Sequence, residues 1–208
     1  MEKKRQRSRS SPHDSATPRL RRSASAVPHH SITPPLHRSP APVPLPVVIL
    51  CGGLGTRIRS VAGDRPKSLV PVNGRAFVEH QLELLRRRGV HDVLLCVGYG
   101  AGRIRAHVGD GSAWGVRVRY SEEDPARLLG TGGALVHALP LLPPAFLLMY
   151  GDSYLPTDYR AVVRAFEKSA SPALMCVYLN RDAGDKSNVR IAGDRVVYYS
   201  KRAGPGEA

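Results

Sequence analysis

The chain has 208 residues, of which 42% are hydrophobic, and a formal net charge of +14 at pH 7. That length and apolar content fit a folded domain with a substantial core and exclude a chain that is disordered throughout. No apolar run approaches the roughly 18 residues of a membrane span, so we expect no membrane association and a cytoplasmic location.

Residues 1–46 differ in composition from the rest of the chain. They hold nine basic and two acidic side chains, so this segment carries seven of the fourteen net positive charges of the chain. It also holds nine of the eighteen prolines. Such a segment buries too little apolar surface to offset the entropy of ordering, and we predict a disordered basic tail rich in Pro, Ser and Arg. A solvated tail without a partner is the favoured interpretation. Binding to an anionic surface, a transit peptide and a start site assigned too far upstream are alternatives.

From residue 47 onward, short apolar runs alternate with amphipathic segments. Continuous apolar runs ended by glycine are typical of strands buried on both faces, and a 3.6-residue apolar period indicates helices. We predict buried strands in 46–53, 93–98, 145–152 and 172–179, a half-exposed strand in 116–120, helices in 76–89, 101–111, 131–139 and 159–169, and a hairpin in 188–202 turning at Gly193-Asp194. In the first helix, Gln81 stands on the same stripe as Val78, Leu82 and Leu85.

This alternation predicts a three-layer α/β domain over residues 47–208 with a mostly parallel sheet. Ligands of such sheets bind beyond the carboxyl ends of the strands. The first strand's glycine-rich loop, Gly98–Gly100 and Gly151-Asp152 are therefore expected on one rim. The chain has three cysteines, Cys51, Cys96 and Cys176. Each lies in an apolar run, so we expect all three to be reduced and buried.

The segment 50–72, LCGGLGTRIRSVAGDRPKSLVPV, joins glycines and basic residues directly after the first strand. Glycine permits close backbone approach, so several N–H groups can surround a phosphate chain. A Rossmann fingerprint would need glycine where Ile58 stands, and no P-loop run occurs. A tight turn with solvated basic residues is the alternative. The candidate anion-binding residues are Gly52, Gly53, Gly55, Thr56, Arg57 and Lys67.

The stretch GGLGTRIRSVAGDRPKSLVPVNGRAFVEHQLELL resembles the signature of the sugar-phosphate nucleotidyltransferases, in which G-G-x-G-T-R precedes P-K and a short strand. The resemblance continues through VGYG, GDGSAWGVRVRYSEE, LLGTGGALVHALPLL and YGDSYLP, and covers residues 47 to about 202. Within this family, the sequence is most similar to the group of heptose- and mannose-1-phosphate guanylyltransferases and muramate-1-phosphate uridylyltransferases. The resemblance implies a Rossmann-like, GT-A-like nucleotidyltransferase fold.

The resemblance also implies a reaction in which a nucleoside triphosphate and a sugar 1-phosphate give an NDP-sugar and pyrophosphate, with Mg²⁺ as cofactor and GTP or UTP favoured. The implied catalytic residues are Arg57 and Lys67, and the implied metal ligand is Asp152. The nucleotide-binding residues that it implies are Gly52, Gly53, Gly55, Thr56, Gly98, Tyr99, Gly130, Thr131, Gly132 and Gly133. Asn188 and Lys201 stand where the family contacts the sugar and its 1-phosphate. Without its neighbours, an aspartate at a strand end such as Asp152 is often a turn former or a helix cap.

In the family, a second aspartate that shares the metal follows soon after the lysine, and no such residue follows Lys201. We therefore expect a nucleotidyltransferase that is incomplete at its C-terminus, with low or no turnover alone. Two alternatives remain open at this point. One is a catalytically impaired, nucleotide-binding domain that regulates or partners another subunit. The other is nucleic-acid binding through the basic tail, which is disfavoured because no aromatic residues for base stacking stand between its arginines.

Overall fold

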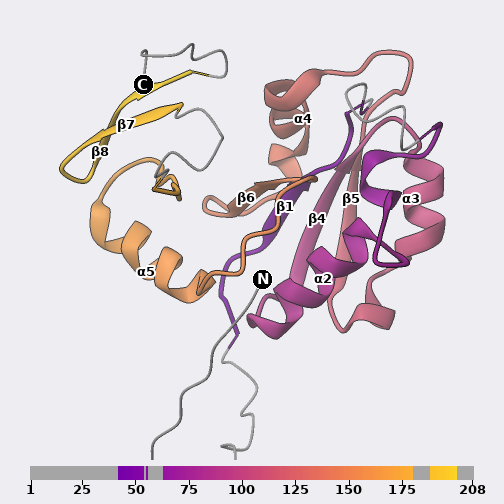
Figure 1. Cartoon of the computed structure of the whole chain (residues 1–208), viewed down its shortest axis with the longest axis horizontal. Coiled ribbons are helices and arrows are strands. Elements are labelled where there is room, and N and C mark those ends of the chain that lie inside the picture. Colours follow the sequence, from indigo (N-terminus) through magenta and orange to yellow (C-terminus); the bar gives the residue numbers. More distant parts are fainter. Residues whose placement is uncertain (1–41, 54, 56–62, 180–187, 201–208) are drawn as a thin grey trace, which may run out of the picture. The chain divides into compact units, whose positions relative to one another are not determined.

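A parallel four-stranded sheet forms the centre of the computed structural model, which describes residues 42–53, 55, 63–179 and 188–200 (Figure 1). The strands are β1 (Val47–Leu50), β4 (Asp92–Val97), β5 (Arg117–Glu122) and β6 (Leu147–Tyr150). Their order in the sheet is β5-β4-β1-β6, and all neighbours run parallel. The predicted α/β fold class with a parallel sheet is confirmed.

Helices cover both faces of this sheet (Figure 1). Side chains of α2 (Phe77–Arg87), α3 (Ala101–Val108) and α5 (Tyr159–Ser169) share one apolar core with alternate residues of β1 and β4, whereas α4 (Gly130–Ala138) packs on the opposite face. Alternation along β1 shows this division, because Val47 and Ile49 belong to the first core and Val48 to the second. The three layers follow from the apolar strands β1 and β4, which are covered on both faces as predicted. The strand predicted to be buried over 145–152 forms as β6, but it lies at the edge of the described sheet and is half exposed, with Leu148 and Tyr150 47% and 45% exposed. Within the described part of the chain, no helix is long and apolar enough to cross a lipid bilayer.

Short elements complete the described chain. Two-residue strands β2 (Pro71–Val72) and β3 (Arg75–Ala76) pair across the predicted turn at Asn73-Gly74. Strands β7 (Val189–Ala192) and β8 (Arg195–Tyr199) form the predicted hairpin, in which Gly193 takes a φ of +61° at the turn. Three 3₁₀ turns are η2 (Lys67–Leu69), η3 (Ser112–Trp114) and η4 (Leu139–Leu141).

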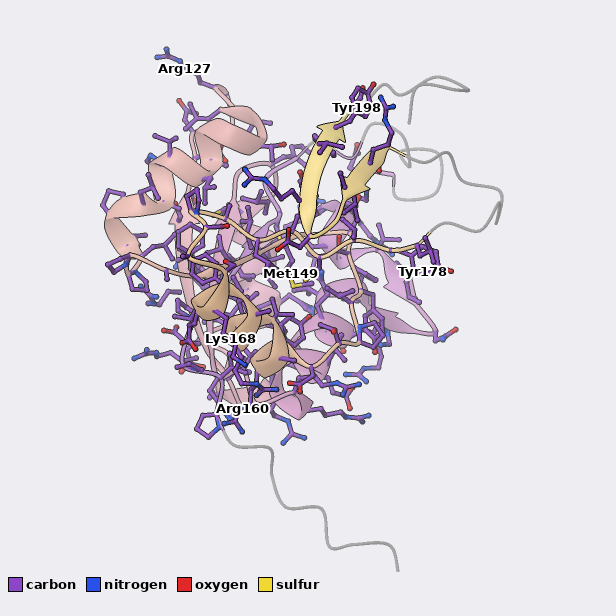
Figure 2. All side chains as sticks on the ribbon, turned by 90° about the vertical axis from the view of Figure 1, so that its left-hand side faces the viewer. Arg127, Met149, Arg160, Lys168, Tyr178 and Tyr198 are labelled. Carbon is purple, nitrogen blue, oxygen red and sulfur yellow. The ribbon has the colours of Figure 1, made fainter. Side chains whose placement is uncertain are left out.

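The strand that the sequence predicts over 172–179 does not form. This segment has no regular secondary structure and is exposed throughout, with Tyr178 84% exposed and pointing outward in Figure 2. An apolar run favours an extended chain, but a strand forms only where its N–H and C=O groups meet a partner, and β6 is an edge strand of the described sheet. Cys176 lies in this segment and is exposed, so the expectation of a buried thiol is wrong there and confirmed for Cys51 and Cys96.

Candidate active site

The carboxyl ends of the four parallel strands meet at one edge of the sheet, as expected from the sequence. Leu50 at the end of β1 stands in register between Cys96 of β4 and Tyr150 of β6. The segments that follow these strands therefore form one rim. The rim consists of residues 51–53 after β1, 98–100 after β4, 123–129 after β5 and 151–153 after β6.

The glycines after β1 and β4 divide into two kinds. Gly52 and Gly98 pack closely together: the N–H of Tyr99 donates to the Gly52 carbonyl at 3.4 Å, and a Cβ on Gly98 would lie 3.3 Å from the same oxygen. Gly53 is exposed, and a Cβ there would meet no atom within 4 Å. Gly53 is thus open to a ligand, whereas Gly52 and Gly98 keep the two loops in contact. Gly55 has a φ of +61°, a conformation that favours glycine.

Lys67 and Asp152 form an ion pair on this rim. Their Nζ and Oδ2 atoms are 2.5 Å apart although 85 residues separate them in the chain, and their side chains are 37% and 51% exposed. Lys67 begins η2 and Asp152 follows β6, so separate elements bring the cation and the carboxylate together. The structure thus joins the predicted catalytic lysine to the predicted metal ligand.

Three contacts support the loop before Lys67. Gly100, with a φ of +69°, faces Pro66 so closely that an added Cβ would lie 2.3 Å from the proline Cγ. The Tyr99 hydroxyl and the Arg103 guanidinium donate to the Asp64 carbonyl at 3.2 and 2.8 Å. The side chain of Tyr99, predicted to lie near the base, therefore holds the segment that leads into Lys67.

The predicted glycine turn at 130–133 forms the first turn of α4. Gly130 has a φ of +72°, and neither Gly130 nor Gly132 would bring a Cβ within 4 Å of another atom. Thr131 is exposed, and Gly133 packs on Leu129, whose Cβ would lie 2.6 Å from an added Cβ. The first N–H groups of a helix have no intrahelical acceptor, so this turn offers donors to an anion.

Two polar residues to which the sequence analysis assigned no role lie beneath the rim. Glu123 is only 5% exposed; its Oε2 accepts the Leu129 N–H at 2.7 Å, and its Oε1 would lie 3.2 Å from a Cβ on Gly52. It thereby connects the loop after β1 to the start of α4. Gln81 is fully buried on α2 and donates to the carbonyls of Tyr150, the last residue of β6, and of Ser153 in the following loop. The sequence signal for Gln81 is a polar residue on an otherwise apolar stripe.

Burial excludes the rim cysteine as a nucleophile. Cys51 lies directly after β1, and desolvation, followed by the charges of Cys96 and Asp152, raises the pKa of its thiol to about 12. The thiolate is the reactive form of cysteine, and it is negligible at neutral pH for such a group. The rim chemistry therefore rests on glycine N–H groups, the lysine and the carboxylate.

The remaining predicted site residues lie elsewhere or outside the described residues. Asn188 precedes β7 and is exposed, and its carbonyl accepts the Ser200 N–H at 3.0 Å across the hairpin. In the described part of the chain, no hydrogen bond or ion pair joins Asn188 to Lys67 or Asp152. Thr56, Arg57 and Lys201 lie outside the described residues, so their roles stay predictions.

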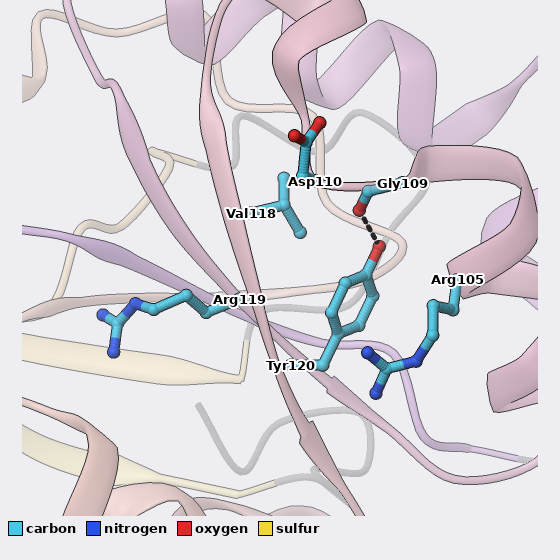
Figure 3. A pocket seen from close by; sticks show the side chains of 6 residues that line it. All are labelled: Arg105, Gly109, Asp110, Val118, Arg119 and Tyr120. Atoms are coloured by element: carbon cyan, nitrogen blue, oxygen red, sulfur yellow. Dashed lines mark hydrogen bonds between the residues drawn. The ribbon is translucent and has the colours of Figure 1, made fainter.

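A separate surface pocket of about 370 Å³ lies beside β5, where Tyr120 and Arg105 meet (Figure 3). The Tyr120 hydroxyl and the Arg105 guanidinium of this pocket are already paired. The Tyr120 hydroxyl donates to the Gly109 carbonyl at 2.6 Å, and Arg105 stacks 4.3 Å from the Tyr120 ring centre while pairing with Glu122 at 2.9 Å. This pocket contains neither Lys67 nor Asp152, so it is not the candidate active site.

Residues 46–187 match the family model described as Nucleotidyl transferase. The chain is 36% identical over 115 residues to a D-glycero-alpha-D-manno-heptose 1-phosphate guanylyltransferase of Campylobacter jejuni, covering 55% of this chain and 50% of that protein. It is 39% identical over 100 residues to an N-acetylmuramate alpha-1-phosphate uridylyltransferase of Caulobacter vibrioides, covering 48% and 41%.

Among solved structures, HddC from Yersinia pseudotuberculosis complexed with GMP-PN is similar, with a TM-score of 0.53 and 35% identity over 58% of this chain and 53% of that one. The chain thus spans about half the length of these proteins.

Proposed function

The chain belongs to the nucleotidyl transferase family, and from this membership we propose that it transfers a nucleotidyl group from GTP or UTP to a sugar 1-phosphate. An oxygen of the sugar phosphate attacks the α-phosphorus, the bond from that phosphorus to the bridging α–β oxygen breaks, and pyrophosphate leaves with the electron pair. Relatives named for guanylyl and for uridylyl transfer to sugar 1-phosphates support this substrate class. The cytoplasmic location expected from the sequence stays a prediction.

The observation that carries the proposal is the Lys67–Asp152 pair, 2.5 Å apart at the carboxyl edge of the sheet. The attacking phosphate oxygen is already ionised, so the reaction needs no general base. It needs alignment of two anionic substrates and positive charge near the phosphates. Lys67 supplies a compact cation of the kind used on phosphates, and the open turns at Gly53 and Gly130 supply N–H donors.

Asp152 fits Mg²⁺ only in company with nucleotide phosphates. Among the described residues, no group of three or more His, Cys, Asp or Glu side chains is placed to hold a metal ion. Mg²⁺ usually keeps several waters and takes one or two carboxylates plus substrate phosphates, and one exposed carboxylate beside the rim suits that mode. When bound, Mg²⁺ would neutralise charge on the triphosphate. Asp152 would hold the metal in that case, and Lys67 would be available to a phosphate oxygen.

The test is pyrophosphate release from GTP, UTP, CTP and dTTP with mannose, heptose and muramate 1-phosphates in the presence of Mg²⁺. We expect turnover with GTP or UTP, and a loss of about 10²- to 10³-fold in Lys67→Met and Asp152→Asn. Lys168→Met, which removes an exposed lysine of α5, is the matched control and keeps wild-type activity. Equal activity of Lys67→Met and Lys168→Met would refute the role of the ion pair.

A titration with the same nucleotides, made beside this assay, separates the alternatives. Nucleotide binding without turnover identifies the catalytically impaired domain, and absence of nucleotide binding overturns the proposal. The predicted tail of residues 1–46 is too long at its C-terminal end, because Val43 is buried in the core and the Pro46 carbonyl accepts the Leu147 N–H at 2.9 Å. Deleting residues 1–41 therefore leaves nucleotide affinity unchanged if the rim binds the nucleotide. Loss of nucleic-acid binding on that deletion, in a chain without nucleotide affinity, would instead favour the third alternative.

A further inference from the structure

Gln81 is a fully buried polar side chain in the middle of an apolar core. It lies on α2 at 0% exposure, beside Val78 and Leu82, which are equally buried. A buried amide in such surroundings costs free energy unless its polar atoms are paired. The contacts of its side-chain amide therefore indicate why the residue is polar.

The Gln81 amide group braces the turn that carries Asp152. Its Nε2 donates to the Ser153 carbonyl at 2.8 Å and to the Tyr150 carbonyl at 3.3 Å. The same two residues close the turn, because the Ser153 N–H donates to the Tyr150 carbonyl at 3.0 Å. Gly151 and Asp152 are the central residues of this turn, so one side chain ties together both of its ends.

Backbone contacts with β1 hold the turn from its other side. The Gly151 N–H donates to the Leu50 carbonyl at 2.9 Å, and a Cβ on Gly151 would lie 2.8 Å from that oxygen. The turn is thus enclosed between β1 and Gln81, whereas the Asp152 side chain remains 51% exposed. Only the carboxylate reaches out toward Lys67.

The orientation of the Gln81 amide follows from its surroundings. Two carbonyl oxygens face the NH₂ group, so rotating the amide by a half-turn would set its own oxygen against both of them. In the observed orientation Oε1 is buried without a hydrogen-bond partner among the described residues. The Gln81 side chain thus pairs its Nε2 with the turn while its Oε1 stays without a hydrogen bond.

We propose that Gln81 is a positioning residue for Asp152: it fixes the turn 150–153 so that the Asp152 carboxylate is held beside Lys67 and presented to a divalent cation. This inference rests on the proposed function for the role of the carboxylate, but the bracing of the turn does not depend on it. Replacing a residue that orients a metal ligand typically lowers metal affinity by about 10- to 100-fold.

The experiment compares Gln81→Met, which removes the donors at nearly constant length, with Leu82→Met, a volume-conserving change at a neighbouring, equally buried position that carries no hydrogen-bond donor. Hydrogen exchange is measured at the Ser153 amide of the full chain. We expect exchange about threefold to tenfold faster in Gln81→Met than in Leu82→Met, as the loss of one or two hydrogen bonds implies. Equal exchange in the two variants overturns the proposal.

Binding of Mn²⁺ in the presence of GTP and without a sugar phosphate, followed through the electron paramagnetic resonance signal of the ion, tests the consequence for the carboxylate, because one carboxylate holds the metal only together with nucleotide phosphates. We expect Asp152→Asn to abolish binding and Gln81→Met to weaken it about 10- to 100-fold, with Leu82→Met unchanged. If Asp152→Asn weakens binding and Gln81→Met does not, the positioning role is wrong. If Asp152→Asn binds Mn²⁺ like the wild type, the metal role in the proposed function is wrong, and hydrogen exchange alone decides whether Gln81 braces the turn.

A second measurement covers the case in which Gln81→Met does not fold. The side-chain amide protons of Gln81 are observed in the wild-type chain by ¹⁵N NMR. Protection from exchange comparable to that of core backbone amides supports the two hydrogen bonds. Exchange at the rate of a solvent-exposed glutamine overturns them.

Discussion

Replacing Gly100 by alanine tests how the rim loop before Lys67 is held. Gly100 adopts a left-handed conformation, with φ +69° and ψ +22°, and an added Cβ would lie 2.3 Å from Cγ of Pro66. The left-handed backbone costs an alanine about 1–2 kcal/mol. The overlap with the proline ring adds about 1–3 kcal/mol, as overpacking usually does.

Two other glycines separate these costs. Gly74 has a φ of +78° and open space around it, so Gly74→Ala carries the backbone strain alone. Gly102 lies in α3 without positive φ and also in open space, so Gly102→Ala gains up to about 1 kcal/mol of helix propensity. At about 2–4 °C per kcal/mol for a domain of this size, we expect thermal midpoints lowered by about 4–20 °C in Gly100→Ala and about 2–8 °C in Gly74→Ala.

Thermal unfolding followed by circular dichroism measures these midpoints, and pyrophosphate release measures the effect on the site. Because Pro66 precedes Lys67, its displacement in Gly100→Ala moves the lysine, and activity is expected to fall on the order of tenfold to a hundredfold. Gly74→Ala keeps its activity. The reasoning is refuted if Gly100→Ala melts together with Gly74→Ala, since the contact with Pro66 then contributes nothing.

Two further outcomes are expected. Glu123→Ala leaves the Leu129 N–H without its buried acceptor and lowers the free energy of unfolding, measured in urea titrations, by about 1–3 kcal/mol. Alanine at the adjacent, exposed Glu122 lowers it by less than about 1 kcal/mol. Equal losses in the two variants would contradict the buried contact. In the native chain at pH 8, a thiol-specific reagent labels the exposed Cys176 and reaches the two buried cysteines only after unfolding, because burial shields them and raises their thiol pKa values to about 12 and about 11. Partial burial also raises the thiol pKa of Cys176, so Cys176 reacts more slowly than a fully exposed thiol. Rapid labelling of all three cysteines would contradict the packing of β1 against β4.

Local patterns in the sequence account for most of the fold. The apolar run at Val47–Leu50 is buried on both faces because strands on either side and helices above and below enclose it, as a continuous apolar strand requires. The apolar stripe of residues 76–89 became α2, and the Asn73-Gly74 and Gly193-Asp194 pairs became turns. Each of these features depends on residues a few positions apart, so a local pattern suffices to predict it.

The segment 172–179 shows where such patterns fail. It is an apolar run like the one that forms β4, yet it forms no strand and is exposed, because pairing depends on a neighbouring strand that its own residues do not specify. The expectation of a buried thiol at Cys176 fails for the same reason.

The sequence by itself determined that glycine turns, Lys67 and Asp152 belong to one rim, because parallel strands place their carboxyl ends at a single edge. Only the tertiary structure decided that the lysine and the aspartate touch, and that Glu123 and Gln81 support the rim from below. These contacts join residues that lie 6 to 85 positions apart in the chain and on different elements. Their geometry is set by the packing of helices on the sheet, which the local periodicity of a sequence does not specify.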